Sequence, residues 1–258
     1  MSSSRSILYL IPSFLEENAL QTLPAYLLDA VKECNSFFVE NERSARRYLK
    51  ALWKEMVIDD YEWFTIHKAE EEIRAAFRLQ LKAGKTIGLI SEAGCPGVAD
   101  PGQLLTETAH EMGATVRPLV GPSSILLALM GSGMNGQQFR FSGYLPVDAT
   151  GRIKALRDLE AESQRLHCTQ LFIETPYRNN QLLESILQTC RDQTRLCIAA
   201  NLTSSKEFIS TRTIREWKEA AAAGKGEPGL PDQHKLPDLH KQPVIFCLYA
   251  SSPVSSGH

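Results

Sequence analysis

The segment Ser91–Gly102, which reads SEAGCPGVADPG, combines the residue types that a loop needs to hold a small ligand. Its three glycines allow a ligand to approach the backbone closely, and its two prolines fix the path of the chain. Its carboxylates, Glu92 and Asp100, can accept protons and bind amines or hydroxyls. Because an ordinary turn does not need so many special backbone positions, we interpret the segment as a ligand-binding loop; the alternative is a structural crossover.

The elements on either side of this loop place it where ligands bind in α/β proteins. The apolar run Thr86–Ile90 before it predicts a buried strand, and the amphipathic run Leu104–Met112 after it predicts a helix. In open α/β sheets, ligands bind outside the carboxyl ends of the strands. We therefore expect a ligand at the carboxyl end of the Thr86–Ile90 strand.

Strands and helices alternate along most of the chain, which predicts an α/β fold with mainly parallel or mixed sheets. The predicted strands are Ile7–Ile11, Ser36–Glu40, Thr86–Ile90, Thr115–Pro118, Phe139–Gly143, Thr169–Glu174, Arg195–Ala200 and Val244–Tyr249, with a strand or turn near Phe208. The predicted helices are Ala19–Cys34, Glu42–Trp53, Ala69–Ala83, Leu104–Met112, Ser123–Met130, Ile153–Arg165, Asn180–Cys190 and Ile214–Ala222.

Composition and charge restrict the class of protein. Of the 258 residues, 43% are hydrophobic and 22% are charged, and the formal net charge is -2, which is ordinary for a soluble protein. Any site for a polyanion must therefore be a local patch. No apolar run approaches the ~20 residues that a membrane helix needs. None of the six cysteines belongs to a C-x-x-C pair, so we expect reduced cytoplasmic thiols and no metal site.

Two further groups of polar residues follow predicted strands. The sequence GPSS at residues 121–124 turns the chain into a predicted helix, whose start attracts carboxylates and other anions. Plain helix capping explains these four residues equally well. The group Glu174–Arg178, ETPYR, places a carboxylate, a hydroxyl, a phenol and a guanidinium at one strand end, or it simply begins the next helix.

A basic helix follows the strand end at Glu40. One face of this helix carries five cations, and the opposite face is apolar. Such a face can follow a phosphate backbone, although a solvated helix surface is the alternative that the pattern alone favours. The five cations are Arg43, Arg46, Arg47, Lys50 and Lys54.

Two other patterns carry no site in our interpretation. Gly131–Gly136, GSGMNG, matches the dinucleotide-binding letters G-x-G-x-x-G, but it follows a predicted helix and leads to a strand, which is the wrong context. We interpret it as a helix end and a turn. The Pro- and Gly-rich segment Gly224–Gln242 is interpreted as a surface loop, because His234 and His240 have no third metal ligand at helical spacing.

Together these pieces resemble the tetrapyrrole methylase superfamily and, within it, the ribosomal small-subunit RNA methyltransferase I family. Four family motifs occur in the same order, between Leu8 and Tyr249. S-D-A-G-T-P-G-I-S-D-P-G is matched by Ser91–Gly102, P-G-P-S by Val120–Ser123, F-x-G-F-L-P by Phe141–Pro146, and E-S-P-H-R by Glu174–Arg178. The family's E-D-T-R is matched loosely by Glu40–Arg43.

The resemblance implies two α/β domains, residues 1–118 on the substrate side and residues 119–258 on the cofactor side, the latter also carrying dimerisation. It implies S-adenosylmethionine in the cleft between them and a cytoplasmic homodimer without membrane attachment. It also implies methyl transfer to a ribose 2′-oxygen of a cytidine in small-subunit (16S) ribosomal RNA.

The same resemblance assigns roles to individual residues. The residues implied for catalysis are Glu40, Arg43 and Asp100. Those implied for the cofactor are Glu92, Ala93, Gly94, Cys95, Pro96, Gly97, Val98, Gly121, Ser123, Ser124, Glu174, Thr175 and Pro243. Those implied for RNA are Arg43, Arg46, Lys50 and Lys206.

The chain departs from the family pattern in three places. The family follows its first strand with A-T-P-I-G-N-L, whereas Pro12–Asn18 of this chain contains no glycine. Glu92 and Cys95 replace an aspartate and a threonine, and R-E-L-T-K appears as Asn201–Lys206. Two alternatives therefore stay open: a methyltransferase for a small molecule such as a tetrapyrrole, and a cofactor-binding protein that has lost catalysis.

Overall fold

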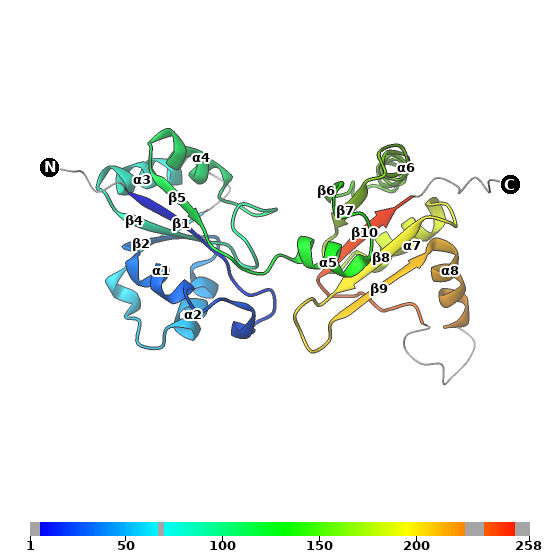
Figure 1. Ribbon diagram of the computed structural model, residues 1–258, viewed down its shortest axis with the longest axis horizontal. Helices are drawn as coiled ribbons and strands as arrows, with labels where there is room; N and C mark the ends of the chain where they lie inside the picture. The colour runs from blue at the N-terminus through cyan, green and yellow to red at the C-terminus, as the bar shows by residue number, and fades with distance from the viewer. Residues whose placement is uncertain (1–5, 67–69, 225–234, 251–258) are drawn as a thin grey trace. The chain divides into compact units, whose positions relative to one another are not determined.

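The computed structural model describes residues 6–66, 70–224 and 235–250. The chain forms two compact units, Met1–Ser123 and Ser124–His258, and each is built around one five-stranded sheet (Figure 1). The predicted α/β class with parallel and mixed sheets is confirmed. None of the helices in the described part of the chain has the length and apolar character that crossing a bilayer requires.

The sheet of the first unit is entirely parallel, with the strand order β3-β2-β4-β1-β5. Its strands are β1 (Ile7–Ile11), β2 (Ser36–Val39), β3 (Glu62–Thr65), β4 (Thr86–Ile90) and β5 (Thr115–Pro118). Because all five strands run in the same direction, their carboxyl ends meet at one edge of the sheet. The loops that leave this edge are therefore neighbours in space.

Helices cover both faces of this sheet, as the apolar character of its central strands requires. One face carries α1 (Leu27–Glu33) and α2 (Glu42–Leu52), which pack with Tyr9 and Phe37. The other face carries α3 (Glu70–Lys82) and α4 (Gln103–Glu111), which pack with Leu8 and Phe38. Two short 3-10 helices, η1 (Leu20–Thr22) and η2 (Ile58–Asp60), complete the unit.

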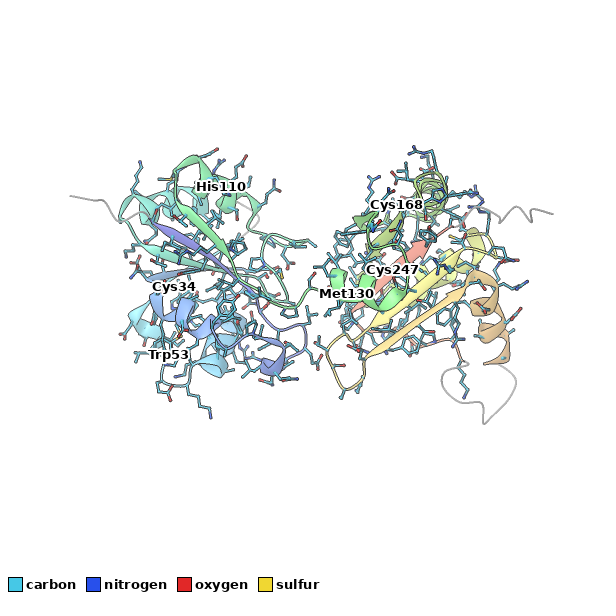
Figure 2. All side chains as sticks on the ribbon, viewed as in Figure 1. Cys34, Trp53, His110, Met130, Cys168 and Cys247 are labelled. Carbon is cyan, nitrogen blue, oxygen red and sulfur yellow. The ribbon has the colours of Figure 1, made fainter. Side chains whose placement is uncertain are left out.

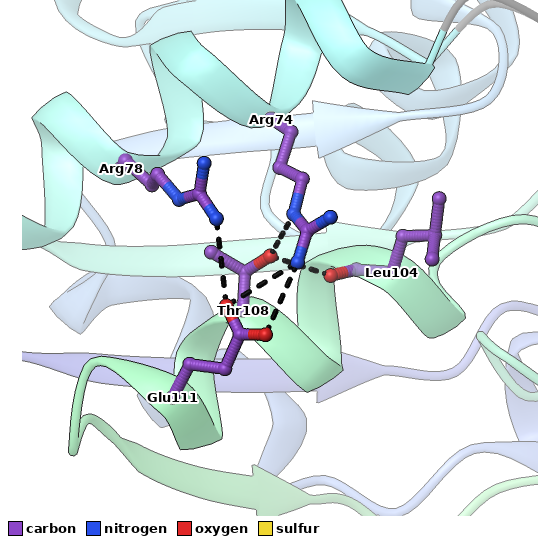
Figure 3. Close-up of polar contacts among 5 residues, drawn as sticks. All are labelled: Arg74, Arg78, Leu104, Thr108 and Glu111. Carbon is purple, nitrogen blue, oxygen red and sulfur yellow. Dashed lines mark hydrogen bonds and ion pairs between the residues drawn. The ribbon is translucent and has the colours of Figure 1, made fainter.

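A polar network joins α3 to α4 (Figure 3). Arg74 donates from Nε to the hydroxyl of Thr108 at 2.7 Å and from a terminal nitrogen to the carboxylate of Glu111 at 3.2 Å. Arg78, one turn further along α3, donates to the same carboxylate at 3.4 Å. The Thr108 hydroxyl donates in turn to the carbonyl of Leu104 at 2.7 Å. The network holds in place the helix that follows strand β4 and its loop.

The sheet of the second unit is mixed, with the order β6-β7-β10-β8-β9. Strands β6 and β7 are parallel, and the remaining pairs are antiparallel. The strands are β6 (Phe139–Tyr144), β7 (Thr169–Ile173), β8 (Arg195–Ala200), β9 (Phe208–Thr213) and β10 (Val244–Tyr249).

The two faces of this sheet are covered unequally. On one face, α6 (Ala149–Leu166), α7 (Asn179–Thr189) and α8 (Ile214–Ala223) bury a large apolar core that includes Trp217. On the other face, α5 (Ser124–Ser132) packs against β8, β9 and β10. Figure 2 labels Met130 on α5 and Cys247 on β10, and the six cysteines of the chain are free thiols.

The structure departs from the predicted elements in a few places. Strand β3 is absent from the predicted strands. Its sequence, EWFT, is too short to show a strand pattern, and in the structure none of its four residues is buried. The predicted helix Ala19–Cys34 is broken after η1, since Pro24 lacks the N–H group that a helix interior needs. The segment near Phe208, predicted as a strand or a turn, is confirmed as a strand, β9.

The remaining predictions concern a glycine-rich turn and two segments of which the structure describes only a part. The stretch GSGMNG is confirmed as a helix end and turn, because α5 ends at Ser132 and Gly133 has a φ of +64°. Ala69, predicted to begin a helix, lies outside the described residues, as do residues 225–234 of the predicted surface loop, including His234.

Candidate functional site

All five strands of the first sheet end at one edge, and the structure packs the loops after β1, β4 and β5 directly against one another. The loop after β1 contacts the loop after β4 through Ser13, whose N–H donates to the carbonyl of Gly94 at 2.9 Å. The Ser13 hydroxyl donates to the carbonyl of Ser91 at 3.1 Å. Ser13 is 2% exposed, so this short junction excludes water.

The loop after β5 joins the same cluster through Gly121. A Cβ atom built on Gly121 would lie only 2.2 Å from the Cβ of Pro12, so only glycine fits at this position. The Sγ atom of Cys95 lies 3.5 Å from the carbonyl oxygen of Pro122 and 3.8 Å from that of Gly121. Residues from the ends of β1, β4 and β5 therefore form one packed group.

The loop Ser91–Gly102 has the backbone that its composition predicted. Gly94, Gly97 and Gly102 have φ angles of +73°, +78° and +124°, which favour glycine. A Cβ atom on Gly102 would also meet Leu89 at 2.8 Å, whereas one on Gly97 would meet nothing within 4 Å. The backbone around Gly97 is therefore open to an approaching molecule.

Carboxylates from the ends of β2 and β4 gather beside this loop. The carboxylate of Glu40 accepts the backbone N–H of Glu92 at 3.0 Å, and the hydroxyl of Ser44 donates to the carboxylate of Glu92 at 3.2 Å. Burial raises the pKa of Asp100 to about 6; the charges of Glu40 and Glu92 also raise it, and a hydrogen bond from Ser91 opposes the rise. Asp100 is therefore a carboxyl group that changes charge close to neutral pH.

Helix α2 begins at this carboxylate cluster. Asn41 caps the helix, since its side-chain oxygen accepts the N–H groups of Arg43 at 3.0 Å and Ser44 at 3.2 Å. The Tyr48 hydroxyl donates to the carbonyl of Pro12 at 2.7 Å and thereby ties the helix to the loop after β1. The cap and this tie fix where the first turn of α2 lies.

Several of the predicted RNA-binding cations of α2 have partners in the protein. Arg46 pairs with Glu42 and lies over the ring of Trp63 at 5.1 Å. Arg47 pairs with Glu17 at 2.6 Å, and the Lys50 ammonium donates to two backbone carbonyls just after the helix, those of Lys54 and Met56. Arg43 is exposed, and no described residue pairs with its side chain.

The predicted cofactor residues of the second unit meet at one edge of its sheet. Glu174 follows β7 and Pro243 precedes β10, and the antiparallel register of these two strands brings their ends together. The N–H of Asn201, at the end of β8, donates to the carbonyl of Pro243 at 3.0 Å. Ser124 begins α5, and Lys206 lies in the exposed turn before β9.

The Glu174 side chain is 1% exposed and lies beside Arg178. Burial alone would raise the pKa of this carboxyl. Hydrogen bonds from Arg178 at 2.7 Å and from the N–H of Thr175 at 2.6 Å outweigh burial and hold the pKa below its usual value. Its second oxygen, Oε2, has no hydrogen-bond partner among the described residues.

Reasoning from the sequence missed the parts of the site that depend on contacts between distant segments. It assigned no role in the site to Ser13, to Ser44 or to Tyr48, whose hydroxyl binds the carbonyl of Pro12. The signal available for Ser13 was its position just after the first strand, next to the strand that carries the Ser91–Gly102 loop. Nothing in the local sequence marked the other two residues.

Comparisons with known proteins identify the family. The family model for tetrapyrrole (corrin/porphyrin) methylases matches residues 20–218, and the chain belongs to this family. Diphthine synthase, a solved structure, aligns with a TM-score of 0.63 at 14% identity, over 95% of this chain and 90% of its own. At that identity the similarity concerns the fold alone.

Curated relatives carry the name that the sequence motifs suggested. The chain is 34% identical over 169 residues to ribosomal RNA small subunit methyltransferase I of Escherichia coli O157:H7, which covers 64% of this chain and 58% of that protein. It is 28% identical over 211 residues to the protein of the same name from Vibrio cholerae serotype O1, covering 81% and 69%. The aligned part thus spans less than two thirds of the first relative.

The raised pKa of Asp100 predicts how its substitution changes stability. The pKa of this carboxyl rises from 3.8 in the unfolded chain to about 6 in the folded protein, so the folded protein binds the proton more tightly. The free energy of unfolding is therefore highest below about pH 4, where the group is protonated in both states, and it falls as the pH rises through 6. We expect Asp100→Asn to be more stable than the wild type at pH 7.5, by about 1 kcal/mol after allowance for partial exposure, and equally stable at pH 4. Urea unfolding at both pH values measures the difference.

The matched control is Asp59→Asn, which changes an exposed aspartate and should give no gain at pH 7.5. An Asp100→Asn protein that is less stable than the wild type at pH 7.5 would contradict the assigned environment of Asp100.

Proposed function

We propose that this chain is an S-adenosylmethionine-dependent methyltransferase that modifies a ribose 2′-oxygen in small-subunit ribosomal RNA. The observation that carries the proposal is the packed group of loops at the carboxyl edge of the first sheet, with its three carboxylates Glu40, Glu92 and Asp100. Membership of the tetrapyrrole methylase family and the names of the curated relatives support the same reaction class.

The chemistry of the residues fits the cofactor. A carboxylate such as Glu92 suits an amino group, and the backbone around Gly97 leaves room for an approaching ligand. We assign the cofactor to the residues 92–98, to Gly121, Ser123 and Ser124, and to Glu174, Thr175 and Pro243. When bound, S-adenosylmethionine supplies an electrophilic methyl group.

The protein's own residues would orient the ribose hydroxyl and accept its proton. A ribose hydroxyl is a weak nucleophile, and a carboxylate that accepts its proton helps the reaction. Asp100 suits this role, because a pKa of about 6 keeps it mostly ionised at neutral pH while making it more basic than an exposed aspartate. Glu40 holds the backbone of Glu92, and Arg43, which is exposed in the first turn of the helix after Glu40, would hold a phosphate of the RNA.

The proposal includes a cytoplasmic homodimer. Helix α5 supports a dimer, because it is apolar on most of its surface and covers its sheet with only one side. Met130 is 77% exposed, and Leu126 is also exposed. An apolar helix face of this kind is typical of a surface that another chain covers.

One observation favours a different acceptor. The loop Pro12–Asn18 lacks the glycine turn of the family, and Phe14 packs edge-on against Tyr48 with ring centroids 5.3 Å apart. The aromatic side chain of Phe14 thus lies in the loop after the first strand, where the family has a glycine turn. The second candidate function is therefore methyl transfer to a small molecule, with cofactor binding without catalysis as the remaining alternative.

Transfer of a labelled methyl group to RNA tests the proposed function. Purified protein is incubated with labelled S-adenosylmethionine and small ribosomal subunits that lack native modification. We expect the label in the RNA, at a ribose, and we expect Asp100→Asn to lower the rate at least tenfold, as for loss of a proton acceptor.

The control is a related enzyme that labels the same subunits. No label from this chain, beside a working control, would contradict the RNA proposal. Label in a porphyrinoid instead of RNA would support the small-molecule alternative.

The basic helix generates a separate prediction about affinity. Arg43→Ala should weaken binding to a small-subunit RNA fragment and lower the slope of log affinity against log salt by about one unit, because one phosphate contact is lost. Arg47→Ala is the matched control, since that guanidinium already pairs with Glu17. Fluorescence anisotropy across a salt series measures both variants, and an unchanged slope for Arg43→Ala would refute the contact.

A further inference from the structure

Two exposed tyrosines stand at the edge of the second sheet where β6 and β7 end. Tyr144 is the last residue of β6 and is 61% exposed, and Tyr177 follows β7 and is 70% exposed. Strands β6 and β7 are parallel neighbours, so both tyrosines follow the same edge of the sheet. They occupy the positions at which the family motifs given above have a phenylalanine and a histidine.

Basic side chains lie near both tyrosines. The Lys241 ammonium lies over the ring of Tyr177 at 5.9 Å from its centroid, and His240 meets the same ring edge-on at 5.9 Å. Arg178 lies within electrostatic range of Tyr144. The carboxylate nearest to Arg178, that of Glu174, is buried, and the exposed carboxylate of Asp238 accepts the backbone N–H of His240 at 3.1 Å and the side chain of Asn180 at 2.7 Å. Lys241 is therefore the cation that lies against an exposed ring of this surface.

The surface is held in position by the segment before β10. The N–H of Lys241 donates to the carbonyl of Pro176 at 2.9 Å, and the side chain of Asn179 donates to the carbonyl of Gln242 at 2.7 Å. Asn180 accepts the N–H of Leu239 at 2.9 Å. Because three hydrogen bonds fix this segment to the start of α7, Lys241 and Tyr177 keep their relative position without a ligand.

We propose that Tyr144 and Tyr177 form a stacking surface for unpaired bases of the RNA substrate, with Lys241 holding an adjacent phosphate. Aromatic rings that stand free in solvent next to cations are the groups with which proteins bind single-stranded RNA. A buried apolar pocket would suit a tetrapyrrole, whereas these two rings are exposed to solvent and one of them lies beside the ammonium group of Lys241. The inference rests on the proposed function and names the part of the substrate that the second unit binds.

Binding of a fluorescent, unstructured ten-nucleotide RNA by the full chain tests this proposal. We expect Tyr177→Ala and Tyr144→Ala each to weaken binding about tenfold without changing the salt slope, because stacking is lost and no charge changes. Tyr177→Phe keeps the ring and should bind like the wild type. Lys241→Ala should instead lower the salt slope by about one unit.

Matched controls come from the same unit. Phe139→Ala removes an exposed ring at the opposite end of β6, and Lys154→Ala removes an exposed cation from α6, so both should leave binding unchanged. A duplex of the same length should bind the wild type more weakly than the single strand and should not distinguish the tyrosine variants.

Three results would overturn the stacking surface. The first is unchanged RNA affinity in both tyrosine-to-alanine variants. The second is loss of affinity for S-adenosylmethionine in calorimetry with RNA affinity retained, which would place the tyrosines in the cofactor site. The third is equal weakening by Tyr177→Phe and Tyr177→Ala. Tyrosine-dependent RNA binding by a chain that transfers no methyl group would instead contradict the proposed function alone.

Discussion

The close approach of Gly121 to Pro12 is the contact on which the candidate site depends. Because a Cβ atom at residue 121 would lie 2.2 Å from the Cβ of Pro12, only a hydrogen fits there, and the loops after β1 and β5 pack together. Cys95 then lies against the carbonyls of Gly121 and Pro122, and Ser13 binds the backbone of the loop after β4. The glycine at this contact thus comes from the loop after β5, the parallel neighbour of β1, whereas Pro12–Asn18 contains none.

The carboxyl edge of the parallel sheet also brings three carboxylates together, those of Glu40, Glu92 and Asp100, and neighbouring groups stabilise them. All three carboxylates accept hydrogen bonds: Glu40 from a backbone N–H, Glu92 from a serine hydroxyl, and Asp100 from Ser91. The third, Asp100, responds through a raised pKa, which gives it the proton affinity of a base near neutral pH. In the second unit, the carboxylate that follows β7, that of Glu174, is buried beside Arg178, and Tyr144 and Tyr177 are exposed.

Much of this arrangement could be predicted from the sequence because it is local. The apolar run before Ser91 and the glycines after it define a strand and its loop, and the bounds of β4 agree with the prediction. Contacts between distant segments could not be predicted: Arg46 reaches Trp63 on the unpredicted strand β3, and Arg47 reaches Glu17. The sequence alone suggests a uniformly basic helix face, but Arg46 and Arg47 have partners within the protein, whereas no described residue pairs with the side chain of Arg43.

Calorimetric titration of S-adenosylmethionine into the wild type, Gly121→Ala and Gly136→Ala tests the central claim most directly. The account predicts that the wild type and Gly136→Ala bind equally, since a methyl group at residue 136 meets nothing within 4 Å. It predicts at least about tenfold weaker binding for Gly121→Ala, because the overpacked methyl group must push apart the loops after β1 and β5. Undiminished binding by Gly121→Ala, or loss of binding by Gly136→Ala alone, would contradict the assignment of the site to the first sheet's edge.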